Sequence, residues 1–294
     1  MPLIIVNGEK VPHDSMCISA FDRGITLGHG LFETILINNG CTPLINYHWE
    51  RLVASAKLIN INIPFTRTEL EHMIQELIDL NELRGANGGV RLTVTDGVAP
   101  RGILSNGHQP STFIINTFSM ATHSNTAMSA SVVLTRKNEN SLSSQIKSTS
   151  YLDLILAKQE AVSKGFEEAF LLNSKDNLAE GAITNIFVVK DNKIYTPSVA
   201  DGALPGITRY IILNELHFDP GEFSVEEKSI TLDFLKQADE IFISNALLGV
   251  RAIKVLDDLV LSTPYQVTDL ISARYQEFIA SKSLEYVEKR SLTY

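Results

Sequence analysis

The chain has 294 residues, of which 44% are hydrophobic and 20% are charged, a composition that supports a sizeable core without disulfides or structural metals. Its formal net charge is −9, which argues against nucleic acid as the main partner, because phosphate backbones bind Lys- and Arg-rich surfaces. Cys17 and Cys41 lack metal-type spacing, no run approaches eighteen apolar residues, and the first residues lack a signal-peptide pattern, so we expect a cytoplasmic protein with no membrane segment and no metal site.

The first part of the chain mixes β-type runs with segments of helical spacing, as in a small α+β domain. A turn at Asn7-Gly8 follows the first apolar run and predicts a hairpin. Apolar residues three and four positions apart predict the helices. The predicted strands are 3–6, 31–38, 90–95 and 111–118, and the predicted helices are 48–60 and 68–83.

Residues 120–127 are mostly small and polar, which predicts a linker between a small domain at 1–119 and a larger one at 128–294. In the larger domain the helix at 151–163 is expected to bury Leu152, Ile155, Leu156 and Ala157. The other predicted helices are 207–216 and 264–286, and the predicted strands are 130–134, 169–173, 185–189, 193–196 and 241–244.

Lys147 lies among serine and threonine residues just before the helix at 151–163. A single lysine is most often a solvated surface charge. In a partly desolvated site, however, a lysine loses its proton more readily and becomes a nucleophile for an aldehyde. Lys147 is therefore a candidate imine-forming residue.

Two further segments suggest ligand chemistry when they are taken together with Lys147. Glu180 lies between two predicted strands, where a buried carboxylate could keep a pyridine nitrogen protonated. Gly206-Ile207-Thr208 follows a proline and opens a helix, and free N–H groups at a helix start bind anions. Arg51 could clamp the same anion. Taken singly, Glu180 is weak evidence because a turn carboxylate explains it, a plain helix cap explains the helix start better than an anion site does, and Arg51 could be a solvated charge of a helix.

In their order and spacing these segments resemble the fold-type IV enzymes that depend on pyridoxal 5′-phosphate (PLP). The resemblance extends from residues 22–24 and 28–34 to residues 238–250. This group contains branched-chain aminotransferases, D-amino acid aminotransferases and 4-amino-4-deoxychorismate lyases. It implies an α/β (α+β) fold like that of D-amino acid aminotransferase, with a small N-terminal domain, a larger C-terminal domain and PLP between them. It also implies a homodimer.

The resemblance assigns roles to individual residues. It implies that Lys147 forms the imine and then moves protons, that Tyr151 bonds the phenolic oxygen of PLP, and that Glu180 pairs with the pyridine nitrogen. The phosphate would be held by residues from three segments, namely Arg51, Ile207, Thr208, Asn245 and Ala246. Substrate contacts are implied for Phe32, Thr34 and Arg101, with the loop of Arg101 approaching the active site of the partner subunit.

The choice among reactions rests on fewer residues. The Asn245-Ala246-Leu247 turn and the Arg101-Gly102 pair resemble 4-amino-4-deoxychorismate lyases, which release pyruvate and 4-aminobenzoate from a small anionic substrate. Ile103 occupies the position at which D-amino acid aminotransferases tend to have histidine. A branched-chain or D-amino acid aminotransferase is the main alternative, because both reactions share their first steps. A non-catalytic binding protein of the same fold is a further alternative.

Overall fold

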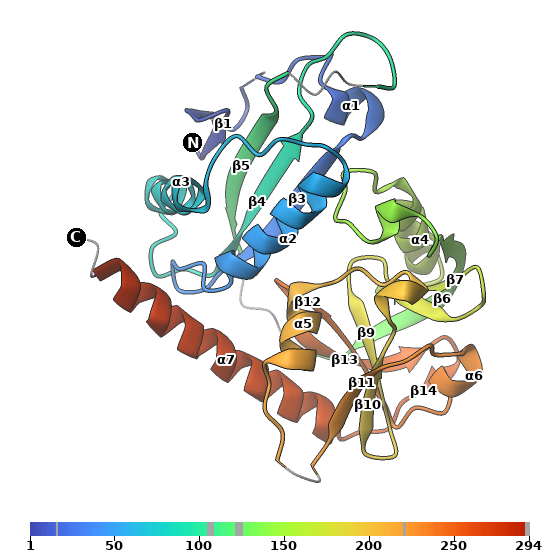
Figure 1. Cartoon of the computed structure of the whole chain (residues 1–294). Helices are drawn as coiled ribbons and strands as arrows, with labels where there is room; N and C mark the ends of the chain where they lie inside the picture. The colour runs from blue at the N-terminus through green and yellow to red at the C-terminus, as the bar shows by residue number, and fades with distance from the viewer. Residues whose placement is uncertain (16, 105–108, 121–125, 220–221, 292–294) are drawn as a thin grey trace. The chain divides into compact units, whose positions relative to one another are not determined.

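The computed structural model describes residues 1–15, 17–104, 109–120, 126–219 and 222–291. The chain forms two compact units, and Figure 1 shows the elements of both. The first unit contains residues 1–123, 147–150 and 279–294, and the second contains residues 124–146 and 151–278.

These units differ from a simple division of the chain into residues 1–119 and 128–294. Lys147–Ser150 belong to the first unit although both flanking segments belong to the second, and the last helix begins in the second unit and ends in the first. Of the predicted linker at 120–127, residues 121–125 lie outside the described residues. The chain therefore passes between the units more than once.

The first unit is built on an antiparallel sheet with the strand order β2-β1-β5-β4-β3. Asn7 and Gly8 have φ angles of 50° and 90°, as a two-residue hairpin turn requires. The strands are β1 (Leu3–Val6), β2 (Glu9–Pro12), β3 (Gly30–Ile37), β4 (Gly88–Thr95) and β5 (Thr112–Ser119).

Two of the helices in the first unit cover one face of this sheet. The helices are α1 (Arg23–Leu27), α2 (Ile45–Leu58) and α3 (Arg67–Leu80). α2 packs on β3, and α3 packs on β1 and β5. Ile35, Val90 and Leu92 are 0% exposed. Because side chains alternate along a strand, the opposite face carries the residues between them.

The second unit contains a sheet with the strand order β11-β10-β9-β12-β13-β6-β7-β8, and β14 pairs with β13. β6 is parallel to both β7 and β13, and β10 is parallel to β11, whereas the other pairs are antiparallel. The strands are β6 (Met128–Lys137), β7 (Glu168–Asn173), β8 (Leu178–Gly181), β9 (Asn185–Lys190), β10 (Lys193–Thr196), β11 (Ser224–Glu227), β12 (Glu240–Asn245), β13 (Gly249–Leu256) and β14 (Leu259–Val260).

Helices lie against the strands of this sheet. α4 packs on β6 and β7, and α5 packs on β12. The core between strands is formed by Ile186, Val188, Ile241 and Ile243, among others. The helices are η1 (Leu142–Ser144), α4 (Leu152–Ser163), η2 (Val199–Asp201), α5 (Ile207–Asn214), α6 (Leu232–Leu235) and α7 (Gln266–Ser291).

The predicted buried face of α4 is wrong, although the helix is where the sequence places it. Ala157 and Ala161 are 0% exposed, whereas Leu152, Ile155 and Leu156 are 66%, 49% and 48% exposed. Alanine allows a helix to approach a sheet closely, so the two alanines face β6 and β7. The larger apolar side chains lie on the outer side of the helix.

Within the described ranges, no helix is both long enough and apolar enough to cross a membrane. The same ranges contain no group of His, Cys, Asp and Glu side chains arranged to hold a metal ion.

Candidate active site

Lys147 lies at the edge of the sheet of the first unit. Its carbonyl oxygen accepts a hydrogen bond of 2.9 Å from the N–H of Phe32, and Leu31 and Ser148 form an antiparallel bridge. The Nζ atom of Lys147 lies 4.4 Å from the centroid of the Phe32 ring. Because paired residues of adjacent strands share a face, Lys147 and Phe32 lie on the same face of the sheet.

Arg91 lies on this face too, on the other side of β3 from Lys147, and the sequence alone did not identify it. Thr34 pairs with Arg91 across β3 and β4, and Arg91 Nη1 lies 3.5 Å from Thr34 Oγ1. The Arg91 guanidinium carbon lies 3.2 Å from the centroid of the Phe32 ring, which is a close cation–π contact. This face therefore presents a guanidinium that can bind a carboxylate through two hydrogen bonds.

Glu33 points to the opposite face of β3, towards α2, and holds two side chains of that helix. Arg51 donates to it from Nε at 2.9 Å and from Nη2 at 2.5 Å. The Nδ1 atom of His48 lies 2.7 Å from Glu33 Oε2. His48 and Arg51 are three residues apart and so share one side of α2. Glu33 and His48 are 2% and 1% exposed.

The charges of this cluster are fixed by its contacts. Burial acts to raise the pKa of Glu33, but Arg51 and the hydrogen bond from His48 outweigh it and lower that pKa to about 2. Burial lowers the pKa of His48 from 6.5. A charged Glu33 can only accept, so neutral His48 carries its proton on Nδ1. The bond to Glu33 occupies the Nε–Nη2 edge of Arg51.

Glu180 lies in β8 of the second unit and is 5% exposed. Its Oε1 atom lies 2.5 Å from Lys137 Nζ, and its Oε2 atom accepts a 2.8 Å hydrogen bond from the N–H of Leu204. The sequence predicted a buried acid here but not the lysine that accompanies it. Burying a carboxylate requires such partners, and they hold Glu180 at a defined position.

The helix start after Pro205 has the features of an anion site. Gly206 is the N-cap of α5, and no side chain in the described part of the chain caps the helix. A Cβ atom at Gly206 would lie 2.0 Å from Asn185 Oδ1, so the close approach of Asn185 requires glycine. Ile207 and Thr208 are 7% and 1% exposed. N–H groups and the dipole at such a terminus favour a phosphate.

Ser244 and Asn245 end β12 beside this region and have different roles. Asn245 Oδ1 accepts hydrogen bonds from the N–H groups of Leu247 and Leu248 at 3.0 and 2.7 Å, so its side chain shapes the turn that contains Ala246. The Ser244 hydroxyl is fully buried and has no hydrogen-bond partner among the described residues. A buried hydroxyl of this kind requires an acceptor.

Tyr151 and Arg101 complete the set of predicted residues. Tyr151 is half-buried and forms the N-cap position of α4 in the second unit. Arg101 is exposed in the loop after β4. Arg23 anchors this loop by donating to the carbonyl oxygens of Gly102 at 2.9 Å and Ile103 at 2.5 Å. The residues that follow, 105–108, lie outside the described residues.

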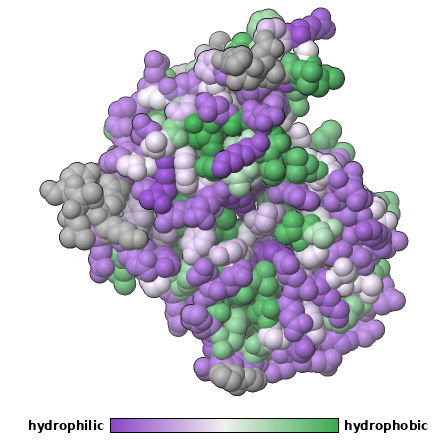
Figure 2. Space-filling view, in the orientation of Figure 1, coloured by the Kyte–Doolittle hydropathy of each residue, from purple (hydrophilic) through white to green (hydrophobic). Residues whose placement is uncertain are grey.

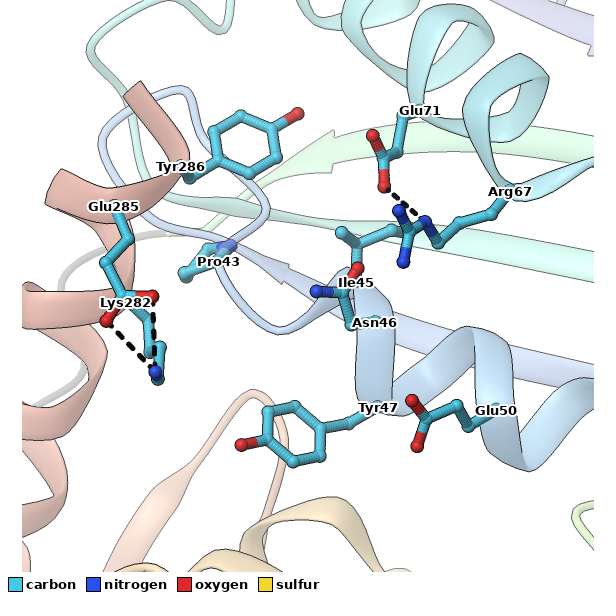
Figure 3. Close-up of a pocket in the computed structure, with 10 residues that line it drawn as sticks. All are labelled: Pro43, Ile45, Asn46, Tyr47, Glu50, Arg67, Glu71, Lys282, Glu285 and Tyr286. Carbon is cyan, nitrogen blue, oxygen red and sulfur yellow. Dashed lines mark hydrogen bonds and ion pairs between the residues drawn. The ribbon is translucent and has the colours of Figure 1, made fainter. Parts of the chain in front are cut away.

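A surface pocket of about 380 Å³ lies elsewhere in the first unit. Four of its charged side chains pair within their own helices, Arg67 with Glu71 and Lys282 with Glu285 (Figure 3). None of the predicted site residues lines it. The lining residues are Pro43, Ile45, Asn46, Tyr47, Glu50, Arg67, Glu71, Lys282, Glu285 and Tyr286.

The predicted residues thus form separate groups within the two units. In the first unit Lys147, Phe32 and Thr34 share a sheet face with Arg91, and Arg51 belongs to the Glu33 cluster on the other side of β3. In the second unit Glu180 hydrogen-bonds to Leu204, and α5 begins three residues later. The carboxylate and the start of α5 are therefore neighbours.

Comparisons with known proteins identify the family of the chain. Residues 30–256 match the family model of the class IV amino-transferases. A provisional branched-chain-amino-acid aminotransferase of Methanocaldococcus jannaschii is 33% identical over 94% of both chains. The aminodeoxychorismate lyase of Bacillus subtilis is 30% identical over 84% of both chains. The crystal structure of a branched-chain aminotransferase from Thermoproteus uzoniensis, with norvaline, has a TM-score of 0.87 at 27% identity over 97% of both chains.

The chain belongs to the class IV aminotransferase family, whose members are PLP-dependent enzymes with this mixed α/β fold. The groups that the chain offers fit that cofactor. Lys147 can supply the amine, and Glu180 can supply a buried carboxylate. The start of α5 can bind the phosphate through its N–H groups, next to the side chain of Asn185. The buried Ser244 hydroxyl, which lacks a partner in the described part of the protein, suits a phosphate oxygen.

Proposed function

We propose that this enzyme is a 4-amino-4-deoxychorismate lyase, which converts its substrate into 4-aminobenzoate and pyruvate. In this proposal Lys147 binds the cofactor covalently, with Tyr151 at its phenolic oxygen and Glu180 at its pyridine nitrogen. Its phosphate lies at the start of α5, between Ile207, Thr208, Arg51 and the turn of Asn245 and Ala246.

Each of these residues has a chemical task in the elimination. PLP, when bound, accepts the electron pair that is left when a proton leaves the carbon next to the substrate nitrogen. Lys147 takes that ring proton. The bond between the ring and the enolpyruvyl oxygen then breaks, and the ring becomes aromatic. The leaving group gains a proton and becomes pyruvate. The charge of Glu180 keeps the pyridine nitrogen protonated throughout.

The observation that carries this proposal is the position of Arg91. Its guanidinium lies over Phe32, on the sheet face that also bears Lys147. A guanidinium in this position suits a substrate with two carboxylates better than one with a purely apolar side chain, because it can bind a carboxylate through two charged hydrogen bonds. We propose that Arg91 binds one carboxylate, that Arg101 of a second copy binds the other, and that Phe32 and Thr34 contact the ring.

An aminotransferase for branched-chain or D-amino acids is the second candidate. It is favoured by the 33% identity to the M. jannaschii protein, which exceeds the 30% identity to the B. subtilis lyase. Both reactions require the same lysine, acid and phosphate cradle. They diverge only in the group that leaves after proton removal, so the substrate contacts decide between them.

The Arg101→Ala variant tests the substrate assignment. We expect its Michaelis constant for 4-amino-4-deoxychorismate to rise by roughly ten- to a hundredfold, since a charged hydrogen bond contributes about 1.5–3 kcal/mol. The visible spectrum of the bound cofactor should remain unchanged. Arg84→Ala, which removes an exposed arginine paired with Asp79, is the control. An unchanged Michaelis constant in Arg101→Ala would remove this residue from the substrate site.

We further propose that the enzyme is a homodimer. Leu134, on β6, is 83% exposed and Leu152, on α4, is 66% exposed. Near Arg101, Ile103 and Leu104 are 85% and 90% exposed, and Figure 2 shows hydrophobic side chains gathered on the surface around α1. Large apolar side chains exposed on the surface of each unit are typical of an interaction surface, and the proposed role of Arg101 requires a second copy.

Light scattering coupled to gel filtration tests the dimer. The Leu152→Asp and Leu156→Asp double variant should shift the mass from two chains towards one, because charges would replace the apolar contact. Leu284→Asp, which changes a 67% exposed leucine of α7, should keep the wild-type mass. A double variant that stays dimeric would exclude this face of α4 from the interface.

A further inference from the structure

Tyr275 of α7 forms one polar contact in an otherwise apolar position. Its side chain is 1% exposed, and its hydroxyl oxygen lies 3.2 Å from Thr208 Oγ1. Thr208 is itself 1% exposed, so water does not compete for this contact. Each hydroxyl can donate one hydrogen bond and accept others. The direction of the bond is therefore set by what else Thr208 must bind.

A phosphate at the start of α5 fixes that direction. Phosphate oxygens accept hydrogen bonds, so the single proton of Thr208 has to be donated to the phosphate. The bond between Thr208 and Tyr275 must then be donated by Tyr275. Burial raises the pKa of Tyr275 to about 12, so its hydroxyl keeps the proton that it donates.

We propose that Tyr275 is a positioning residue for the cofactor phosphate: its hydroxyl donates to Thr208 Oγ1 and so turns the proton of Thr208 towards the phosphate. This inference rests on the proposed phosphate site at the start of α5. It assigns to the C-terminal helix a part in cofactor binding that acts through Thr208.

The ring and the hydroxyl of Tyr275 can be separated experimentally. The ring packs beside Gly249, where a Cβ atom would lie 3.6 and 3.7 Å from ring carbons Cε1 and Cδ1. Tyr275→Phe keeps this packing and removes only the hydroxyl. Thr208→Val similarly keeps the shape of Thr208 and removes its hydroxyl. The two variants therefore test the hydrogen bond with little disturbance of the core.

The test is a titration of the cofactor-free enzyme with PLP and, separately, with pyridoxal, which lacks the phosphate. Tyr275→Phe should raise the dissociation constant for PLP roughly three- to tenfold and leave that for pyridoxal unchanged. In the Thr208→Val background, Tyr275→Phe should have no further effect. In the Thr208→Ser background, which retains a hydroxyl, its effect should return. Tyr210→Phe, at an exposed tyrosine of α5, is the matched control.

Two results would overturn the role of Tyr275. One is an effect of Tyr275→Phe that simply adds to that of Thr208→Val, and the other is an equal loss of affinity for PLP and pyridoxal. Either would make Tyr275 a structural residue only. A Thr208→Val variant with wild-type PLP affinity is a different failure, because it would refute the phosphate site on which this inference rests.

Discussion

The two units hold their proposed cofactor groups by different means. In the first unit Arg51 is fixed by the charged carboxylate of Glu33, which is also hydrogen-bonded to neutral His48, and Glu33 and His48 are almost completely buried. In the second unit Thr208 is held by a neutral tyrosine hydroxyl at a helix start. A buried ion cluster is costly to break because one charge remains unpaired, whereas a neutral hydrogen bond contributes only about 1 kcal/mol. Changes in the first unit should therefore affect both stability and cofactor binding.

We expect the largest effect from a change at Lys147, which belongs neither to the charged cluster of Glu33 nor to the neutral hydrogen bond of Thr208. Lys147→Ala should abolish turnover and the visible absorption band of the bound cofactor, because no other amine is proposed to bind the aldehyde. Borohydride should trap PLP on the wild-type chain and not on the variant. The melting temperature of the cofactor-free protein should stay near that of the wild type. A coloured, active variant would contradict the assignment of Lys147.

Arg51→Ala should show the cost of breaking the charged cluster. The variant leaves Glu33 buried without its main counter-charge, so we expect a loss of roughly 3–5 kcal/mol in the free energy of unfolding. PLP affinity should fall by roughly one to two orders of magnitude. Denaturant unfolding of the cofactor-free protein measures the first effect, and a PLP titration measures the second.

Arg67→Ala is the control for this experiment. Arg67 pairs with Glu71 one helical turn away, and both side chains are partly exposed, at 49% and 29%. Such surface pairs contribute about 1 kcal/mol or less. If Arg51→Ala destabilised the protein no more than Arg67→Ala, the proposed difference between the buried ion cluster of Arg51 and the neutral hydrogen bond of Thr208 would be wrong.

Glu180→Gln should slow catalysis, and it should also lower stability because it leaves Lys137 without its counter-charge. The amide keeps an acceptor for the N–H of Leu204 but lacks the charge that stabilises a protonated pyridine nitrogen. We expect PLP to bind and the turnover number to fall roughly ten- to a hundredfold, which corresponds to about 1.5–3 kcal/mol. Steady-state rates measured with saturating cofactor test this. A wild-type turnover number would leave Glu180 with a structural role only.

We expect the smallest effect in the pH dependence of stability, which two buried acids, Glu33 and Glu168, influence in opposite directions. The pKa of Glu33 is lowered from 4.5 to about 2, so its stabilisation is present above pH 4.5 and is lost as the pH falls towards 2. The pKa of Glu168 is raised, mainly by burial, although Lys158 lies 3.3 Å away. Stability associated with Glu168 is therefore lost as the pH rises above 4.5.

Unfolding curves between pH 3 and pH 7 should separate these two acids. Glu33→Gln should flatten the loss of stability in acid relative to the wild type, and Glu168→Gln should reduce the loss that occurs as the pH rises. If both variants changed the pH dependence of the free energy of unfolding in the same direction, burial and not the partner residues would determine the protonation of these two acids.

The sequence predicted those features that depend on neighbouring residues. Gly206 opens α5 where a proline and an apolar period indicate a helix, and Asn7 and Gly8 form the predicted turn. Arg91 and Glu33 could not be assigned because their contacts depend on strand register and on the packing of α2 against β3. A one-residue shift in register would place each on the other face.

Two further differences have the same physical origin. The apolar period of α4 identified a hydrophobic stripe but not which side of the helix the sheet covers, so Leu152 was expected to be buried and is exposed. Short strands such as β8 and β14 carry too few residues to show a period of two. Membership of Lys147–Ser150 in the first unit is set by pairing with β3, which lies more than a hundred residues earlier.

The proposed function is tested most directly by giving the wild-type enzyme, loaded with PLP, each candidate substrate at equal enzyme concentration. We predict that 4-amino-4-deoxychorismate yields pyruvate and 4-aminobenzoate in equal amounts over many turnovers. Amino transfer from leucine or D-alanine to a keto acid should be slower by at least about two orders of magnitude, since each of these amino acids has one carboxylate and could meet only one of the proposed contacts of Arg91 and Arg101. Rapid amino transfer from leucine or D-alanine without release of pyruvate from 4-amino-4-deoxychorismate would contradict the lyase assignment and establish the aminotransferase in its place.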